Sequence, residues 1–96
     1  MSEKTYKILT FDFDDKVLKE IYYKGNYKNA YNEFRQFLKE NKFDKHPEGS
    51  FYISSVKMDE IELEYIIKKA SETFDWLKYS IKDVRVANLE TPEFSN

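Results

Sequence analysis

Apolar residues recur with the period of a helix in two parts of the chain. Windows 26–41 and 58–74 place apolar residues three and four positions apart, so each predicts an amphipathic helix with one buried stripe. The stripe residues are Tyr27, Ala30, Tyr31, Phe34, Phe37 and Leu38 in the first window and Leu63, Ile66, Ile67, Ala70 and Phe74 in the second. Asn26 is the expected N-cap of the first helix.

Windows with the composition of strands surround these helices. They are 6–13, 43–46, 50–56 and 81–89. Window 43–46 is the weakest, because it is short and Pro47 ends it. Segment 14–24 is rich in charge and is expected to be a connection. The predicted order is therefore strand, helix, strand, strand, helix, strand.

In a single domain, this order most often gives the α+β ferredoxin-like fold. That fold, βαββαβ, has an antiparallel sheet in the order 4-1-3-2 with two helices on one face, and its crossovers are right-handed. A chain of 96 residues has the length of one domain. We therefore expect one domain over residues 1–96, with about 90–96 as a loosely attached tail.

Alternate residues of a strand point to opposite faces of the sheet, so apolar sets identify the face that helices cover. The sets expected under the helices are Leu9, Phe11 and Phe13; Phe51 and Ile53; and Val84 and Val86. The sets expected on the helix-free face are Ile8, Thr10 and Asp12; Ser50, Tyr52 and Ser54; and Ile81, Asp83 and Arg85. In the expected strand order, Asp12, Ser50 and Asp83 meet on this face at one end of the sheet. Asp14 and Asp15 are expected to be a turn residue and a solvated charge.

A sheet face that carries Ile8, Tyr52 and Ile81 favours a symmetric homodimer in which two such faces pack together. Asp12 would then approach its own copy. Two carboxylates ~4 Å apart repel by roughly 4 kcal/mol at an effective dielectric of ~20, so they would need a shared proton, a basic partner or a divalent cation. Mg²⁺ or Mn²⁺ bound by Asp12 would suit phosphoryl chemistry. A structural interpretation stays open, in which Asp12 only ends the strand and Asp83 only pairs with Arg85 or a lysine.

Composition narrows the possible partners. With 16 basic and 18 acidic residues the net charge is −2, so nucleic acid could bind only to a local basic patch. The candidate patch near segment 14–24 consists of Lys16, Lys19, Lys24 and Lys28, with Tyr22 and Tyr23 as candidates for stacking on bases. The absence of cysteine excludes disulfides and thiolate metal sites. No apolar run is long enough to cross a membrane, so we expect a cytoplasmic protein.

Four short motifs occur in a fixed order along the chain. They are TFDF with Asp12, NAYNEFRQFL with Arg35, EGSFY with Ser50, and WLKYSIKDVRVANLE with Asp83. This ordered set resembles the virulence-associated protein D (VapD) family, which is related to the dimeric nuclease subunits of CRISPR adaptation. The resemblance covers about residues 6–94. Lys42 stands where the family usually has a glycine.

The resemblance implies a ferredoxin-like homodimer with endoribonuclease activity, found as the toxin of some toxin–antitoxin pairs. It implies an active site around Asp12, with Ser50 and Asp83 as neighbours, which are the residues that strand alternation also selects. We therefore expect cleavage of single-stranded RNA at the dimer interface. In this mechanism Asp12 holds a divalent ion or orients a water, Asp83 is an acid or base, and Ser50 donates to phosphate. The expected RNA contacts are Arg35, Lys16 and Lys19, although Arg35 could instead form a surface ion pair.

Two other functions stay open. The first is a non-catalytic dimer that acts as a scaffold or binds an antitoxin protein, which an assay of metal-dependent RNA cleavage would distinguish. The second is an RNA-binding module without catalysis. Such a module stacks bases on several aromatic residues of its helix-free face, where only Tyr52 is expected here.

Overall fold

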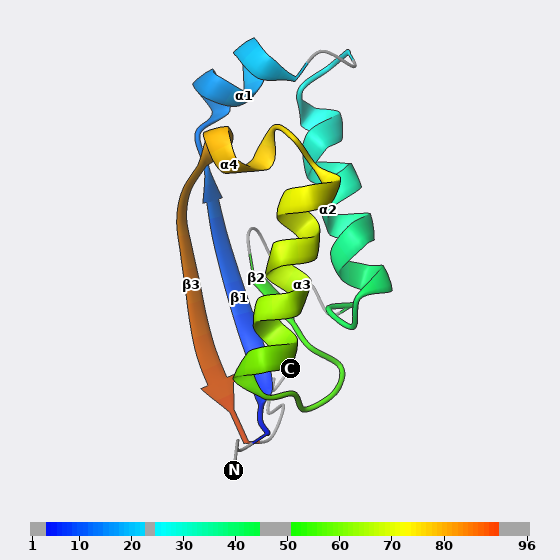
Figure 1. The fold of residues 1–96 in the computed structure, drawn as a ribbon. Coiled ribbons are helices and arrows are strands. Elements are labelled where there is room, and N and C mark those ends of the chain that lie inside the picture. Colours follow the sequence, from blue (N-terminus) through cyan, green and yellow to red (C-terminus); the bar gives the residue numbers. More distant parts are fainter. Residues whose placement is uncertain (1–3, 23–24, 45–50, 91–96) are drawn as a thin grey trace, which may run out of the picture.

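The sheet has one central strand, and the helices cover one of its faces. The computed structural model describes residues 4–22, 25–44 and 51–90, which form an α+β fold with a three-stranded antiparallel sheet and four helices. The elements are β1 (Tyr6–Phe13), α1 (Asp15–Ile21), α2 (Lys28–Glu40), β2 (Phe51–Ile53), α3 (Glu60–Thr73), α4 (Leu77–Ser80) and β3 (Ile81–Leu89). The strand order is β2-β1-β3, and α2 and α3 lie on the same side of the sheet (Figure 1). Within these residues, no helix combines the length and apolar character needed to cross a membrane.

The strongest patterns of the sequence are confirmed. Strands 6–13 and 81–89 are β1 and β3, and the two predicted helices are α2 and α3, each three residues shorter than expected. Their apolar stripes are buried or packed against the core. Phe34 lies at its centre, with its ring centroid 4.6 Å from that of Phe11 in an edge-to-face arrangement.

The predicted strand 43–46 is not found in the part that can be described. Phe43 and Asp44 lie outside any strand. Residues 45–46 lie outside the described ranges, as do Ser50, Tyr23, Lys24 and the tail 91–96. The sheet is therefore antiparallel with three described strands, and the four-strand order 4-1-3-2 is not established by them.

Segment 14–24, expected to be a charged connection, contains a helix that was not predicted, α1. The Asp14 carboxylate caps this helix by accepting from the backbone N–H groups of Lys16, at 3.0 Å, and Val17, at 3.2 Å. Leu18 is fully buried on its inner side. One capping acid and one buried leucine do not form a periodic pattern. A helix can be recognised from its period only over a longer window of sequence.

The faces predicted for window 50–56 are wrong by one residue. Tyr52 is in register with Leu9, so it points to the helix side, whereas Phe51 and Ile53 pair with Thr10 and Ile8 on the helix-free side. Tyr52 is 4% exposed and Phe51 is 42% exposed. Since the side-chain period of a strand is two, a slip of one residue exchanges the two faces completely.

Ile81 also lies on the opposite face from the one predicted. β1 and β3 are in register from Tyr6 with Leu89 to Asp12 with Asp83, and a bulge then pairs Phe13 with Ile81. The extra residue, Lys82, reverses the alternation, so Ile81 packs against the core under the helices. The helix-free face has therefore lost two of the three apolar residues, Tyr52 and Ile81, on which the dimer prediction was based.

Two tyrosine–carboxylate hydrogen bonds join α1 to α2. The Tyr22 hydroxyl, just after α1, donates to Glu33 of α2 at 2.5 Å, and the Tyr31 hydroxyl of α2 donates to Asp15 of α1. Tyr22 is 5% exposed, so the prediction that it stacks on bases is wrong. The bond to Glu33 is the largest cause, ahead of burial, that raises the pKa of Tyr22 to about 12. The pKa of Tyr31 is also raised, first by burial and then by the bond to Asp15.

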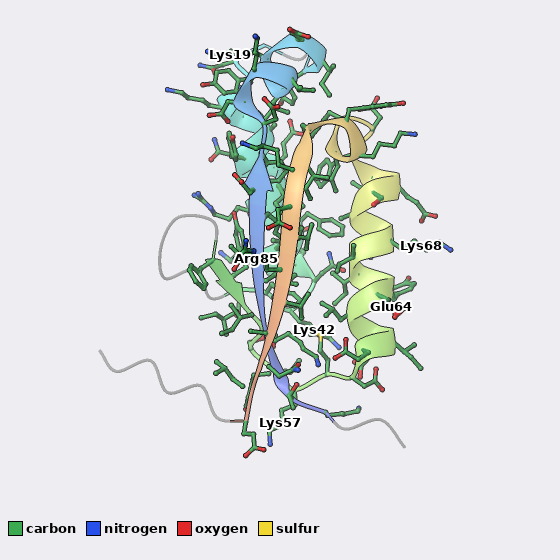
Figure 2. All side chains as sticks on the ribbon, turned by 90° about the vertical axis from the view of Figure 1, so that its left-hand side faces the viewer. Lys19, Lys42, Lys57, Glu64, Lys68 and Arg85 are labelled. Atoms are coloured by element: carbon green, nitrogen blue, oxygen red, sulfur yellow. The ribbon has the colours of Figure 1, made fainter. Side chains whose placement is uncertain are left out.

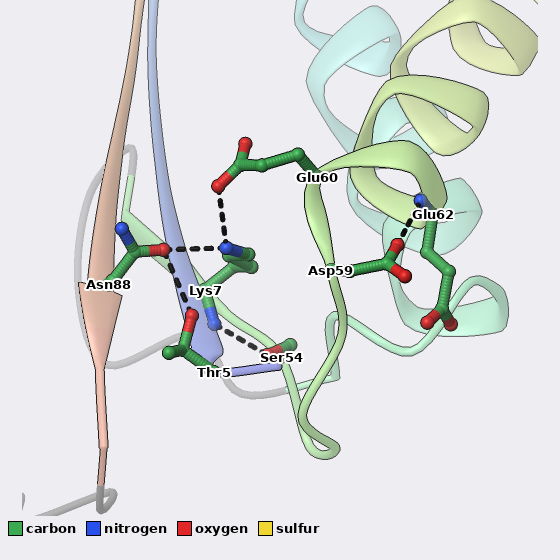
Figure 3. A network of polar contacts seen from close by, with 7 residues as sticks. All are labelled: Thr5, Lys7, Ser54, Asp59, Glu60, Glu62 and Asn88. Carbon is green, nitrogen blue, oxygen red and sulfur yellow. Dashed lines mark hydrogen bonds and ion pairs between the residues drawn. The ribbon is translucent and has the colours of Figure 1, made fainter. Parts of the chain in front are cut away.

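A polar network ties β1 to β3 and α3 at the far end of the sheet (Figure 3). The ammonium of Lys7, whose side chain is 2% exposed, donates to Asn88 at 2.6 Å and to Glu60 at 2.8 Å. The backbone N–H of Lys7 donates to the buried Ser54 hydroxyl at 2.8 Å. Because an unpaired buried charge is strongly unfavourable, Lys7 restrains the elements that supply its partners.

The end of α2 is closed by a residue in the left-handed region. Lys42 has φ of 76°, and the backbone N–H of Phe43 donates to the carbonyl of Leu38 at 2.7 Å. The side chains of Phe43 and Leu38 are both 1% exposed. This is the Schellman arrangement, whose left-handed position usually carries glycine because a Cβ is strained there.

We predict that Lys42→Gly stabilises the protein. The glycine relieves the strain at φ of 76° but adds freedom to the unfolded chain, so the expected net gain in the free energy of unfolding is about 0.5–1 kcal/mol. Lys39→Gly, the same change within helical α2, is the control and should cost about 1 kcal/mol. Urea denaturation measures both, and a loss of stability in Lys42→Gly would contradict the strain argument.

We also predict that alkaline pH weakens the attachment of α1 to α2. Tyrosine in the unfolded chain has a pKa of 10.0, and that of folded Tyr22 is about 12. A raised folded pKa gives stability that is complete below pH 10 and lost as the pH rises through 12. The free energy of unfolding should therefore fall from pH 10 to 12, and less steeply in the double variant Tyr22→Phe/Tyr31→Phe. Tyr65→Phe, at an exposed tyrosine, is the control. An unchanged slope in the double variant would count against these bonds.

Candidate functional site

A polar cleft opens beside the last residues of β1. Its volume is about 310 Å³, and its lining residues are Phe11, Asp12, Phe13, Asp15, Tyr31, Arg35 and Tyr52. We call it the Asp12 cleft. β2 pairs only with Ile8, Leu9 and Thr10 of β1, so among the described residues the last residues of β1 have no partner on this edge. The cleft therefore lies where β1 extends beyond β2, with α1 and α2 supplying its other walls.

Asp12 lies at the junction of this cleft and the helix-free face. It is exposed and in register with Asp83, as the strand alternation predicts. Asp83 accepts from the Nε–H of Arg85 at 2.8 Å, which is the pair that the structural interpretation expected. Arg85 lies over the helix-free side of the sheet (Figure 2). Like charges opposite each other on neighbouring strands are unfavourable, and Arg85 offsets this repulsion only from an exposed position.

Arg35 and Tyr52 form the inner side of the cleft. Burial raises the pKa of Tyr52, while its interaction with the Arg35 guanidinium offsets part of that rise. The Tyr52 hydroxyl is therefore neutral at physiological pH. Arg35 lies with Asp12 in one cleft, as the RNA-contact prediction requires, and the structure pairs it with a tyrosine where the alternative expected an ion pair on the surface.

Tyr31 and Asp15 form the outer side of the cleft, next to α1. The negative charges of Asp15 and Asp12 add to the burial and hydrogen bonding that raise the pKa of Tyr31. The hydroxyl thus keeps its proton and remains a donor close to both carboxylates. Asp15 is not simply the solvated charge that was predicted, because it accepts from Tyr31.

The other predicted contacts are spread around this cleft. Lys16 and Lys19 are exposed on α1, directly after the cleft residue Asp15. The Lys19 ammonium is 5.2 Å from the centroid of the Tyr27 ring, and Figure 2 shows Lys19 beyond the end of the sheet. Ser50 lies outside the described residues, so only Asp12 and Asp83 of the predicted trio are brought together.

The carboxylates suit a weakly held divalent ion more than a structural metal. Across the described residues, no three histidine, cysteine, aspartate or glutamate side chains form a group able to hold a metal. Asp12 with Asp83, or Asp12 with Asp15, offers two carboxylates. Mg²⁺ commonly uses one or two carboxylates and takes its other ligands from water and phosphate, so these residues fit such an ion.

Three cleft residues were missed by the reasoning from sequence: Asp15, Tyr31 and Tyr52. Tyr31 was placed in the core stripe of its helix. Its spacing of four from Arg35 was an available signal, because residues four apart lie on the same side of a helix. Tyr52 offered no such signal, since its face depends on strand register.

No family model matches the chain, and no curated protein matches it.

Proposed function

We propose that the protein is an endoribonuclease that cleaves single-stranded RNA, with Asp12 at the centre of its site. One observation carries the proposal: Asp12, exposed at the end of β1, lines one cleft with a guanidinium and two neutral tyrosine hydroxyls. Phosphodiester cleavage is accelerated by a general base near the attacking oxygen, a role that a carboxylate can fill, and by donors around the phosphate. This cleft contains both kinds of group.

In this mechanism Asp12 orients the attacking water, and Asp83, in register with it, serves as the outer acid or base. Arg35 binds the scissile phosphate. Lys16 and Lys19 guide the backbone of the RNA along α1, and Ser50 is the further phosphate donor. A divalent ion held by Asp12 would lower the pKa of the attacking water and neutralise charge on the phosphate.

The wider fold and assembly are part of the proposal. The described order β2-β1-β3 corresponds to strands 3-1-4 of a ferredoxin-like sheet, which supports that fold. We propose a homodimer through the helix-free face, where Ile8 and Ala87 are in register and Phe51 is 42% exposed. This arrangement would bring Asp12 towards its copy. The resemblance to the VapD family further supports a toxin role with a cognate antitoxin protein.

From the proposed function we predict that Asp12→Asn reduces cleavage of a panel of single-stranded RNAs by about 100-fold or more in the presence of Mg²⁺. The control is Asp75→Asn, which removes the same charge from an exposed turn. Gel electrophoresis of labelled RNA measures cleavage, with and without EDTA, and circular dichroism checks folding. Equal activity of the two variants would reject Asp12 as the central group. Absence of cleavage in all proteins would favour the non-catalytic scaffold.

A further prediction concerns the proposed dimer. Ala87→Arg places a charged side chain within the proposed interface, so light scattering should find monomers at concentrations where the wild type is dimeric. Asn32→Arg, on the exposed side of α2, is the matched control and should leave the dimer intact. A dimeric Ala87→Arg protein would exclude this face as the interface.

A further inference from the structure

The wall of the Asp12 cleft that α2 provides carries two hydrogen-bond donors one turn apart. Tyr31 and Arg35 are separated by four residues, and both line the cleft. Tyr31 is fixed by its ring contact with Phe13, whose centroid lies 5.4 Å away in an edge-to-face arrangement. A neutral phenol and a planar guanidinium side by side are suited to the oxygens of one phosphate group.

Tyr52 limits the freedom of Arg35. Its ring lies 6.3 Å from Phe11 and 6.1 Å from Phe34 between centroids, and it is 4% exposed, so its hydroxyl has a fixed position at the cleft. The guanidinium interacts with this hydroxyl from the solvent side. A long arginine side chain next to Asp12 and Asp15 would otherwise turn towards these carboxylates, since opposite charges attract.

We propose that Tyr31 and Arg35 form a phosphate-binding subsite on α2, in which Tyr52 is the positioning residue for the guanidinium. The ligand is a phosphate group of a nucleotide. The inference rests on the proposed function for its biological meaning, because it names the groups that receive the phosphate of the RNA. Its physical basis is independent of cleavage.

Asp15 is the internal competitor of this phosphate. The Tyr31 hydroxyl has one proton and donates it to Asp15 in the free protein. When phosphate binds, Tyr31 exchanges one anionic acceptor for another, and exposed Asp15 returns to water. Removal of the Asp15 charge therefore favours phosphate twice, by ending the competition and by reducing repulsion.

The test titrates inorganic phosphate and adenosine 5′-monophosphate into protein carrying Asp12→Asn, which removes the neighbouring charge and under the proposed function prevents cleavage. NMR follows the Nε–H of Arg35 and the backbone amides of the cleft, and sodium chloride at equal ionic strength controls for general anion effects. The variants added to this background are Tyr31→Phe, Arg35→Lys, Tyr52→Phe and Asp15→Asn, with Tyr65→Phe as the control for loss of an exposed hydroxyl.

We expect saturable shifts at Arg35 for both ligands. Arg35→Lys keeps the positive charge but loses the planar, two-pronged set of N–H donors, so it should weaken phosphate binding about tenfold. Tyr31→Phe and Tyr52→Phe should each weaken it about fivefold. In Tyr52→Phe the free Arg35 Nε–H signal should also move, as a positioning role requires. Asp15→Asn should tighten binding several-fold, and Tyr65→Phe should have no effect.

Phosphate affinity that is unchanged in Tyr31→Phe and Arg35→Lys would overturn the subsite, and weaker binding in Asp15→Asn would overturn the competition. The two proposals fail separately. Phosphate binding with this pattern in a protein that cleaves no RNA would retain the subsite and reject the nuclease. Cleavage that depends on Asp12 but is unaffected by Tyr31→Phe and Tyr52→Phe would retain the nuclease and reject the subsite.

Discussion

The alternation of side chains along β1 is the constraint on which the rest of the structure depends. β1 pairs with β3 along its length and with β2 from Ile8 to Thr10, and its odd-numbered residues from Leu9 to Phe13 lie on the helix side while its even-numbered residues lie on the open face. Loss of this register would expose the ring of Phe11 and bury the carboxylate of Asp12, both at high cost. The position of Asp12 is therefore fixed by the packing of its neighbours.

The parts of the fold that follow from local pattern could be predicted, and those that depend on distant contacts could not. β1 and β3 were found with their ends because their alternation is long. In β2, Phe51, Tyr52 and Ile53 are all compatible with burial, so the sequence of these three residues does not show which of them point towards the helices. Tyr52 lies on the helix side through its register with Leu9 and its ring contacts with Phe11 and Phe34, which are all distant in sequence. The bulge at Ile81 is equally invisible in the sequence, because one extra residue leaves the composition of the strand unchanged.

The candidate site, too, could be predicted from the sequence only in part. That Asp12 and Asp83 lie on the same face at the same end of the sheet follows from alternation and strand order and was predicted. The cleft was not predicted, because it exists only where β1 extends beyond β2 and where Tyr31 of α2 meets Asp15 of α1. At the opposite end of the sheet, buried Lys7 holds β3 and α3 through Asn88 and Glu60. The middle of β1 is apolar on its helix side, and the Lys7 network occupies one end of the strand. Polar groups of β1 are therefore open to solvent at the other end, where the Asp12 cleft lies.

The chemistry of the Asp12 cleft depends on its donors being mainly neutral. Two carboxylates, Asp12 and Asp15, face one guanidinium, so the cleft keeps a net negative charge. A lysine in place of Tyr31 would form ion pairs with these carboxylates and neutralise part of that charge. A phenol whose pKa is raised instead donates a hydrogen bond and adds no positive charge to the cleft. Packing of the tyrosine rings against the aromatic core thus does two things at once: it stabilises the fold, and it holds two neutral hydroxyls at the Asp12 cleft.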